Sequence, residues 1–135
     1  MNYTQLASRN VVEKTATALQ ENGISVYLAK DSEDAKKKFF ELLQKGAEVM
    51  DMTSVTLDTL GIMKEIEESG KFNAMKKKLY AMDRKTQGRE MQRLGAAPEW
   101  AVGSVQAVTQ DGKVMIASKT GSQLPAYAYG AGNVI

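Results

Sequence analysis

The stretch GAEVMDMTSVTLDTLG, residues 46–61, decides the fold class. Residues 47–52 are a short, mostly apolar run after a glycine, which is typical of a buried β-strand. Ser54 follows as a helix N-cap, and the sequence from residue 55 predicts a helix that ends at Gly70. The buried face of this helix is expected to consist of Val55, Thr59, Ile62 and Ile66. A strand that leads directly into a helix is the unit from which α/β folds are built.

The residues before this stretch show the same alternation of elements. Residues 3–22 predict an amphipathic helix that stops at Gly23, and residues 24–29, ISVYLA, predict a strand. Residues 31–34 then supply the cap and acidic first turn of a second helix. The apolar faces of these helices contain Val12, Ala16 and Leu19 in the first and Phe39, Leu42 and Leu43 in the second. Helix, strand, helix and strand in this order imply right-handed crossovers onto a parallel sheet.

The second half of the chain begins helical and then becomes β-rich. Residues 73–94 predict one long helix. From Trp100 onward two apolar runs flank Asp111-Gly112, which is a strong hairpin signal. Residues 125–132, PAYAYGAG, predict a short helix, and residues 133–135 predict the start of a strand. The whole sequence therefore predicts an α/β fold, with a mainly parallel sheet flanked by helices and a β-hairpin region toward the C-terminus.

Length and charge limit the classes of function. At 135 residues the chain is expected to form one domain, residues 1–135. The formal net charge is only +2, so no strong field is available to attract nucleic acid or a membrane surface, and neither is expected as a partner. The first ten residues contain no apolar signal core, and no run approaches the roughly 18 apolar residues of a membrane span. We therefore expect a cytoplasmic protein.

The sequence contains no cysteine and no histidine. This excludes disulfides, thiolate nucleophiles, Ser-His-Asp catalysis and the usual ligands of zinc and iron–sulfur sites, so we expect no metal site and no cofactor. Carboxylates remain as the available acids and bases, although no pair of them shows a diagnostic spacing. The candidates are Asp51, Asp58, Asp83 and Asp111. The triple-lysine runs at 36–38 and 76–78 are interpreted as solvated helix faces.

Three segments are candidates for binding a small anion. The first comprises Thr53, Ser54 and Thr56, where a strand's carboxyl end becomes a helix, the edge at which α/β sheets bind ligands. The second is the glycine loop that contains Lys119, Thr120, Gly121, Ser122 and Gln123. The third is Gly103 with Ser104, a small-residue break in an apolar run. Each segment also has an ordinary structural interpretation, respectively as a helix cap, a surface turn and a packing requirement.

The same segments carry a resemblance to a known family. They lie in the same order along most of the chain, which makes the match more specific than any one loop. The segments are residues 46–57, 60–61, 103–112, 116–124 and 126–135. The sequence resembles LUD (lactate utilisation) domains. That resemblance implies the fold of the sugar-phosphate isomerase and CoA-transferase superfamily, and a link to the bacterial oxidation of lactate to pyruvate.

The resemblance also bears on partners and extent. LUD proteins accompany iron–sulfur oxidoreductase subunits, and the cluster-bearing members have cysteine motifs that this sequence lacks. It is therefore similar to the small accessory type. Typical LUD chains continue past the position of Ile135, so we expect either a chain truncated at its C-terminus or an abbreviated family member. Related isomerases place acidic residues where this chain has Val105 and Gln106, and the CoA-transferase glutamate has no obvious match, so neither activity is carried over.

Three functions remain open. The first is an accessory factor of lactate utilisation that binds a small anionic metabolite, such as a carboxylate or phosphate ester, and is not an enzyme on its own. The second is an isomerase or acyl- or CoA-transferase-like enzyme that uses a displaced carboxylate or Lys119. The third is a non-catalytic module in which the helix predicted over residues 73–94 docks another subunit. A homodimer is expected from the methionine-rich helix faces and the short final strand.

Overall fold

The computed structural model describes residues 5–135. The helices are α1 Arg9–Glu21, α2 Ser32–Leu42, α3 Val55–Thr59, α4 Ile62–Glu68, α5 Met75–Ala81, α6 Arg84–Ala96 and the π-helical turn η1 Ala126–Gly130. The strands are β1 Glu48–Asp51, β2 Asn73–Ala74, β3 Trp100–Val102, β4 Ala107–Val108, β5 Val114–Met115 and β6 Asn133–Val134. None of these helices is long and apolar enough to cross a membrane.

The described chain separates into two compact units, each built from two segments. The hairpin unit contains the described residues up to Leu28 together with Val105–Ala117, and the sheet unit contains Ala29–Ser104 together with Ser118–Ile135. All ten predicted binding residues lie in the sheet unit. The expectation of one domain over residues 1–135 stays a prediction.

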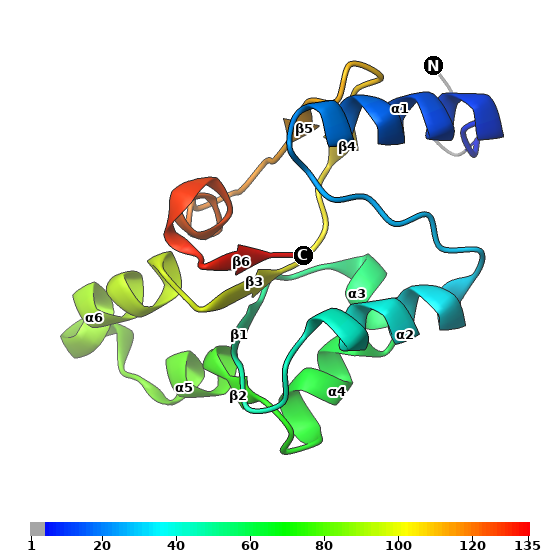
Figure 1. Cartoon of the computed structure of the whole chain (residues 1–135). Coiled ribbons are helices and arrows are strands. Elements are labelled where there is room, and N and C mark those ends of the chain that lie inside the picture. The colour runs from blue at the N-terminus through cyan, green and yellow to red at the C-terminus, as the bar shows by residue number, and fades with distance from the viewer. Residues whose placement is uncertain (1–4) are drawn as a thin grey trace. The chain divides into compact units, whose positions relative to one another are not determined.

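The sheet unit is an α/β structure, as predicted. Its four strands are ordered β2-β1-β3-β6, and every neighbouring pair is parallel. Parallel strands need crossover connections, which α3 and α4 supply between β1 and its neighbour β2, whereas α5 and α6 connect β2 to β3, on the other side of β1. Figure 1 shows β1, β3 and β6 side by side with helices flanking them. The fold therefore places the ends of β1 and β3 next to each other.

Alternate residues of the central strands enter two apolar clusters. Val49, on β1, faces the larger cluster, and Met50 packs against the smaller one. The buried members of the larger cluster are Phe39, Leu43, Ala47, Val49, Leu57, Ile62, Ile66 and Val102. Those of the smaller cluster are Met52, Ala101 and Ala126. Because successive strand residues point to opposite faces, a sheet with helices on both sides buries both sets.

The helix predicted after Ser54 is two helices. Gly61 adopts a left-handed conformation with φ of 66°, which ends α3 and starts α4 in a new direction. This break changes which residues are buried. Ile62 and Ile66 are buried as predicted, but Val55 is 83% exposed and Thr59 is also exposed, so these two assignments are wrong. Leu57 takes the buried position on α3.

The long helix predicted over residues 73–94 is also wrong. Asn73 and Ala74 pair with β1 as the edge strand β2, and the chain then forms α5 and α6. The two helices are separated at Met82, and Asp83 caps the second by accepting a hydrogen bond from the backbone N–H of Lys85 at 2.9 Å. The apolar residues keep helical spacing across Met82, so the sequence pattern alone did not show that the helix is interrupted there.

The predicted cap of α2 is confirmed, and its apolar face is partly wrong. Asp31 accepts a hydrogen bond from the N–H of Asp34 at 2.8 Å. Phe39 and Leu43 are buried, but Leu42 is 47% exposed. The helix therefore contacts the larger cluster through a narrower stripe than the sequence suggested.

The hairpin unit consists of α1 and the antiparallel pair β4–β5. The predicted Asp111-Gly112 turn is confirmed, with Gly112 at φ of 77°. Asn22 at the end of α1 donates hydrogen bonds to the carbonyl oxygens of Asp111 and Gly112, at 3.3 and 3.0 Å. Residues 24–29 form no strand, which corrects the prediction: the apolar run is present, but it has no paired strand within the described chain. The part of the first predicted helix at residues 3 and 4 lies outside the described residues.

Candidate functional site

The carboxyl edge of the parallel sheet brings two of the three predicted segments together. β1 ends at Asp51 and β3 ends at Val102, and these residues are register partners. The pairing extends one step further, because the N–H of Met52 donates to the carbonyl oxygen of Val102 at 2.8 Å. The segments that follow the two strands therefore leave the sheet at the same edge, which is where open α/β sheets bind ligands.

Two serines join these segments. Ser54 Oγ accepts a hydrogen bond from the N–H of Leu57 at 3.1 Å, which confirms Ser54 as the N-cap of α3. The same hydroxyl donates to Ser104 Oγ at 2.9 Å. Ser54 is buried, whereas Ser104 is half-buried. With its oxygen accepting from Ser54, the Ser104 hydroxyl keeps its own hydrogen to donate outward.

The remaining predicted residues of the first segment are not drawn into this contact. Thr53 and Thr56 are exposed. Gly103, the partner of Ser104 in the third segment, donates its N–H to the carbonyl oxygen of Ile135 at 3.0 Å and so continues the pairing of β3 with β6. The core of the candidate site is therefore the pair of serines at the strand ends.

The glycine loop forms hydrogen bonds within itself. Thr120 Oγ1 donates to Ser122 Oγ at 2.9 Å, and the N–H of Gly121 donates to Ser118 Oγ at 3.1 Å. Lys119, Thr120 and Ser122 are exposed, and Gly121 and Gln123 are half-buried. Over residues 5–135, no hydrogen bond links this loop to either serine of the site. The loop is connected to the site through η1, because the carbonyl oxygen of Gln123 accepts from the N–H of Tyr127.

A buried charge network lies at the same edge of the sheet. Asp51 is 1% exposed, and its Oδ2 accepts a hydrogen bond from Lys76 Nζ at 2.9 Å. Lys76 Nζ also contacts Glu67 Oε1 at 3.3 Å. The other carboxylate oxygen of Asp51, Oδ1, is buried and has no hydrogen-bond partner among the described residues. With two carboxylates against one ammonium, the network has no spare positive charge to bind an anion.

The network shifts the pKa of both central groups. Burial raises the pKa of Asp51 to about 6, and this effect exceeds the opposite effect of Lys76. Burial alone would lower the pKa of Lys76, but the hydrogen bonds and charges of Asp51 and Glu67 outweigh it and raise that pKa. Asp51 is thus a buried carboxyl group whose protonation changes near neutral pH, a property often found at functional sites.

Sequence reasoning recognised Asp51 as a candidate acid but missed Lys76. The interpretation of run 76–78 as a solvated face is wrong for Lys76, which is 9% exposed. Its position follows from β2: Ala74 pairs with Val49 on β1, and α5 begins directly afterwards, so Lys76 lies in the first turn of a helix that starts beside β1 and contacts Asp51. The short strand β2 ahead of the lysines could have indicated that Lys76 is buried, but the sequence analysis placed its residues inside one long helix.

Of the other three candidate carboxylates, two have structural roles, and the third forms no contact within the described chain that indicates a function. Asp58 is exposed on α3, and Asp83 caps α6. Asp111 lies in the hairpin turn, where hydrogen bonds from Lys113 and Thr109 lower its pKa to about 2. Over residues 5–135, no cluster of acidic side chains is suited to hold a metal ion.

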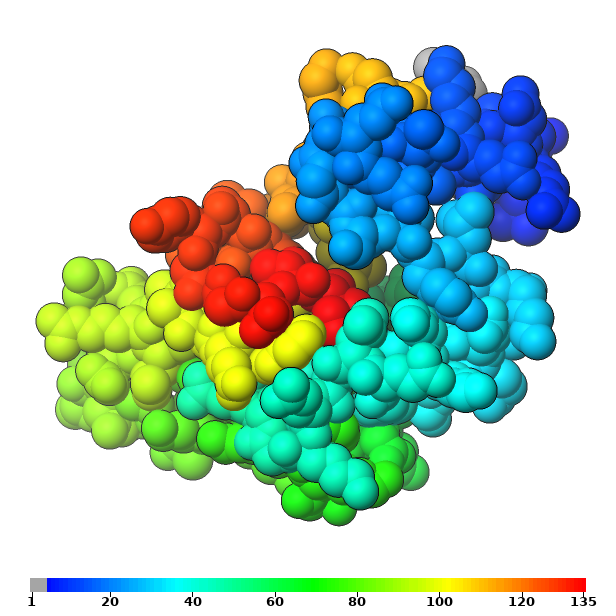
Figure 2. Space-filling view, in the orientation of Figure 1, coloured from blue at the N-terminus to red at the C-terminus, as the bar shows by residue number. Residues whose placement is uncertain are grey.

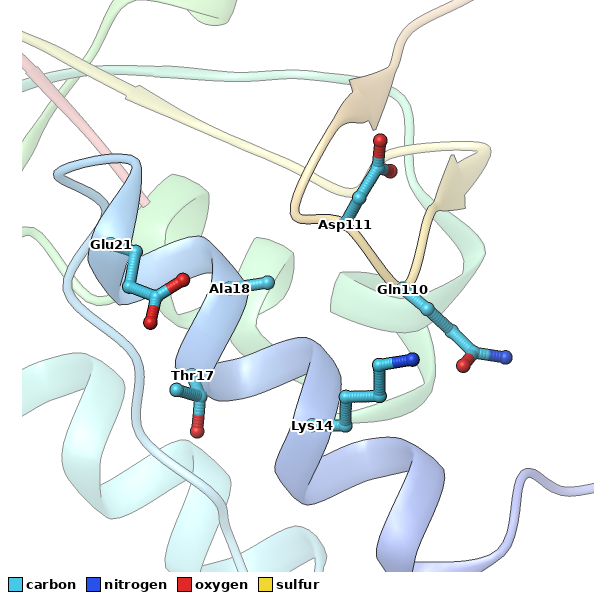
Figure 3. Close-up of a pocket in the computed structure, with 6 residues that line it drawn as sticks. All are labelled: Lys14, Thr17, Ala18, Glu21, Gln110 and Asp111. Carbon is cyan, nitrogen blue, oxygen red and sulfur yellow. The ribbon is translucent and has the colours of Figure 1, made fainter.

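The hairpin unit contains a large open cavity of about 750 Å³ between α1 and the hairpin turn. Figure 3 shows Lys14, Thr17 and Glu21 on α1, and Gln110 and Asp111 on the turn. None of the predicted binding residues lines it. It lies in the hairpin unit, whereas all the predicted binding residues belong to the sheet unit. The carboxyl edge of the sheet therefore remains the better candidate.

The chain matches a known protein family. A family model described as the LUD domain matches residues 12–135, which is most of the chain and includes every segment of the candidate site. No curated protein and no solved structure matches the sequence significantly.

Proposed function

Since the chain belongs to the LUD domain family, whose members are associated with lactate utilisation, we propose that it is an accessory protein of lactate oxidation that binds a small anionic metabolite. In this proposal it acts in the cytoplasm beside iron–sulfur oxidoreductase subunits and does not catalyse the oxidation itself. The proposed binding site is the carboxyl edge of the parallel sheet, centred on Ser54 and Ser104.

The observation that supports this proposal is the hydrogen-bonded pair of serines at the ends of β1 and β3. The N–H of Leu57 donates to Ser54, Ser54 donates to Ser104, and Ser104 is left with a hydrogen to donate. Donors aligned in this way polarise one another, so the last hydroxyl is a better donor than an isolated serine. A carboxylate or phosphate oxygen is the acceptor that benefits most from such a donor.

Isothermal titration calorimetry with lactate, pyruvate, inorganic phosphate, CoA and ribose 5-phosphate tests the proposal. We expect at least one of them to bind, and Ser104→Ala to weaken that binding tenfold or more, because a hydrogen bond to a charged group contributes about 1.5–3 kcal/mol. Ser69→Ala is the matched control, since Ser69 is an exposed serine at the end of α4. Absence of binding by every probe, or equal affinities of the two variants, would contradict the proposal.

A proton-transfer enzyme is the second candidate function, and Asp51 is the observation that favours it. It supplies a carboxyl group with a pKa of about 6 at the same edge of the sheet, displaced from the acidic positions of the related isomerases. Hydrogen exchange at the carbon next to the carbonyl of pyruvate or a sugar phosphate, followed in ²H₂O by NMR, is its test. Exchange that is unaffected by Asp51→Asn would remove this candidate.

A further inference from the structure

Tyr127 reaches the site from η1, the π-helical turn that follows the glycine loop. Ala126 is 1% exposed and anchors η1 in the smaller apolar cluster with Met52 and Ala101. The side chain of Tyr127 packs against this cluster and extends to Gly103. Figure 2 shows the residues of η1 and β6 at the surface of the sheet unit. A segment close to the end of the sequence thereby places a phenol at the end of β3.

The Tyr127 hydroxyl occupies the space that a side chain at position 103 would need. A Cβ atom added to Gly103 would overlap the hydroxyl and would lie 3.0 Å from both Tyr127 Cζ and Met52 Cβ. The backbone of Gly103 is not in the left-handed region, so conformational freedom does not explain this glycine. Its lack of a side chain is instead what admits the phenol next to Ser104.

The same hydroxyl is buried and has no hydrogen-bond partner among the described residues. Among the buried side-chain polar atoms of residues 5–135, only two lack a hydrogen-bond partner: this hydroxyl and Asp51 Oδ1. Both lie at the carboxyl edge of the sheet. An orphaned donor destabilises a folded protein, and phenylalanine would fill the same space without that cost. Burial raises the pKa of Tyr127, so the hydroxyl remains protonated and able to donate.

We infer that Tyr127 is a ligand-contacting residue, whose hydroxyl donates to the same small oxyanion that Ser104 binds. This inference rests on the proposed function and adds a second donor to its site. Gly103 and Ser104 directly follow β3, so the phenol that lies against Gly103 and the hydroxyl of Ser104 come from adjacent positions at the end of that strand. A carboxylate or phosphate at the edge of the sheet has two oxygens with which to accept from both.

The test compares Tyr127→Phe with Tyr129→Phe by calorimetry and by urea unfolding of the unliganded protein. Tyr129 lies on the same turn, is 95% exposed and serves as the matched control. Pyruvate and inorganic phosphate are the probes, which separate carboxylate from phosphate recognition. We expect Tyr127→Phe to weaken binding about tenfold or more and to leave the unliganded protein as stable as the wild type or more stable. Tyr129→Phe is expected to change neither quantity.

The outcomes separate this inference from the proposed function. If Ser104→Ala weakens binding and Tyr127→Phe does not, the inference is overturned and the proposed function stands. If Tyr127→Phe lowers the stability of the unliganded protein, the hydroxyl has a structural partner, and the inference is overturned whatever the probes show. If the wild type binds no probe, the proposed function fails first and the inference fails with it.

Discussion

Replacement of Asp51 by asparagine should remove a distinctive dependence of stability on pH. The folded protein holds this carboxyl group 1% exposed and raises its pKa from the ordinary value of 3.8 to about 6. Between these two pH values the folded chain keeps a proton that the unfolded chain releases. The stabilising contribution is therefore complete below pH 3.8 and is lost as the pH rises through about 6.

The size of the effect follows from the two pKa values. A pKa that moves from 3.8 to about 6 corresponds to roughly 3 kcal/mol in the free energy of unfolding. Asparagine has a similar shape and does not titrate, and Lys76 keeps its contact with Glu67 at 3.3 Å in the variant. Because part of this change falls below pH 4, the wild type should lose about 2–3 kcal/mol relative to Asp51→Asn as the pH rises from 4 to 7.

Urea unfolding of both proteins at pH 4, 5, 6 and 7 measures this difference. Carboxylates common to both proteins contribute similarly to each and largely cancel in the difference. A difference that stays constant with pH would show that the pKa of Asp51 is not raised. A wild type that gains stability relative to the variant toward pH 7 would show that attraction to Lys76 outweighs the effect of burial, and would refute the reasoning.

Two further predictions concern packing and the hairpin turn. Ile66→Ala should lower the free energy of unfolding by about 2–5 kcal/mol, because Ile66 is 1% exposed in the larger apolar cluster. Val55→Ala should change the same quantity by less than about 0.5 kcal/mol, because Val55 is 83% exposed. Urea unfolding of both variants measures the two effects. Similar losses in both would place Val55 in the core. The pKa of Asp111 is lowered to about 2, so its stabilising contribution is present above pH 3.8 and disappears as the pH falls toward 2. Over that range the stability of Asp111→Asn in urea unfolding should approach that of the wild type. A difference in stability that widens as the pH falls would contradict the lowered pKa.

The predicted elements that proved correct depend on short-range signals. Gly23 ends the first helix and Gly112 forms the hairpin turn, both with positive φ. Asp31 and Ser54 cap the helices that follow them. Each signal acts within about four residues, which is the range over which caps and turns determine backbone conformation. Two of the incorrect elements, at residues 24–29 and 73–94, depend on whether a neighbouring strand is available for pairing.

The candidate site was only partly predictable for a related reason. Ser54 and Ser104 were both identified from their local context, and the structure brings them together. Lys76 was missed because it looks like any lysine in a charged run, and its burial depends on contact with Asp51, which lies at the end of β1, a different element. Tyr127 was missed because the gap it fills belongs to Gly103, a residue of another segment.

The amino-acid sequence by itself determined the class of fold, the family and the exclusion of cysteine and histidine chemistry, since these follow from composition, local periodicity and ordered segments. Only the tertiary structure decided which side chains meet. The serine pair joins residues 50 positions apart, and the Asp51–Lys76 pair joins residues 25 positions apart. Contacts of this kind depend on strand order and register, which arise from burying both faces of the sheet at once, and no local pattern encodes them.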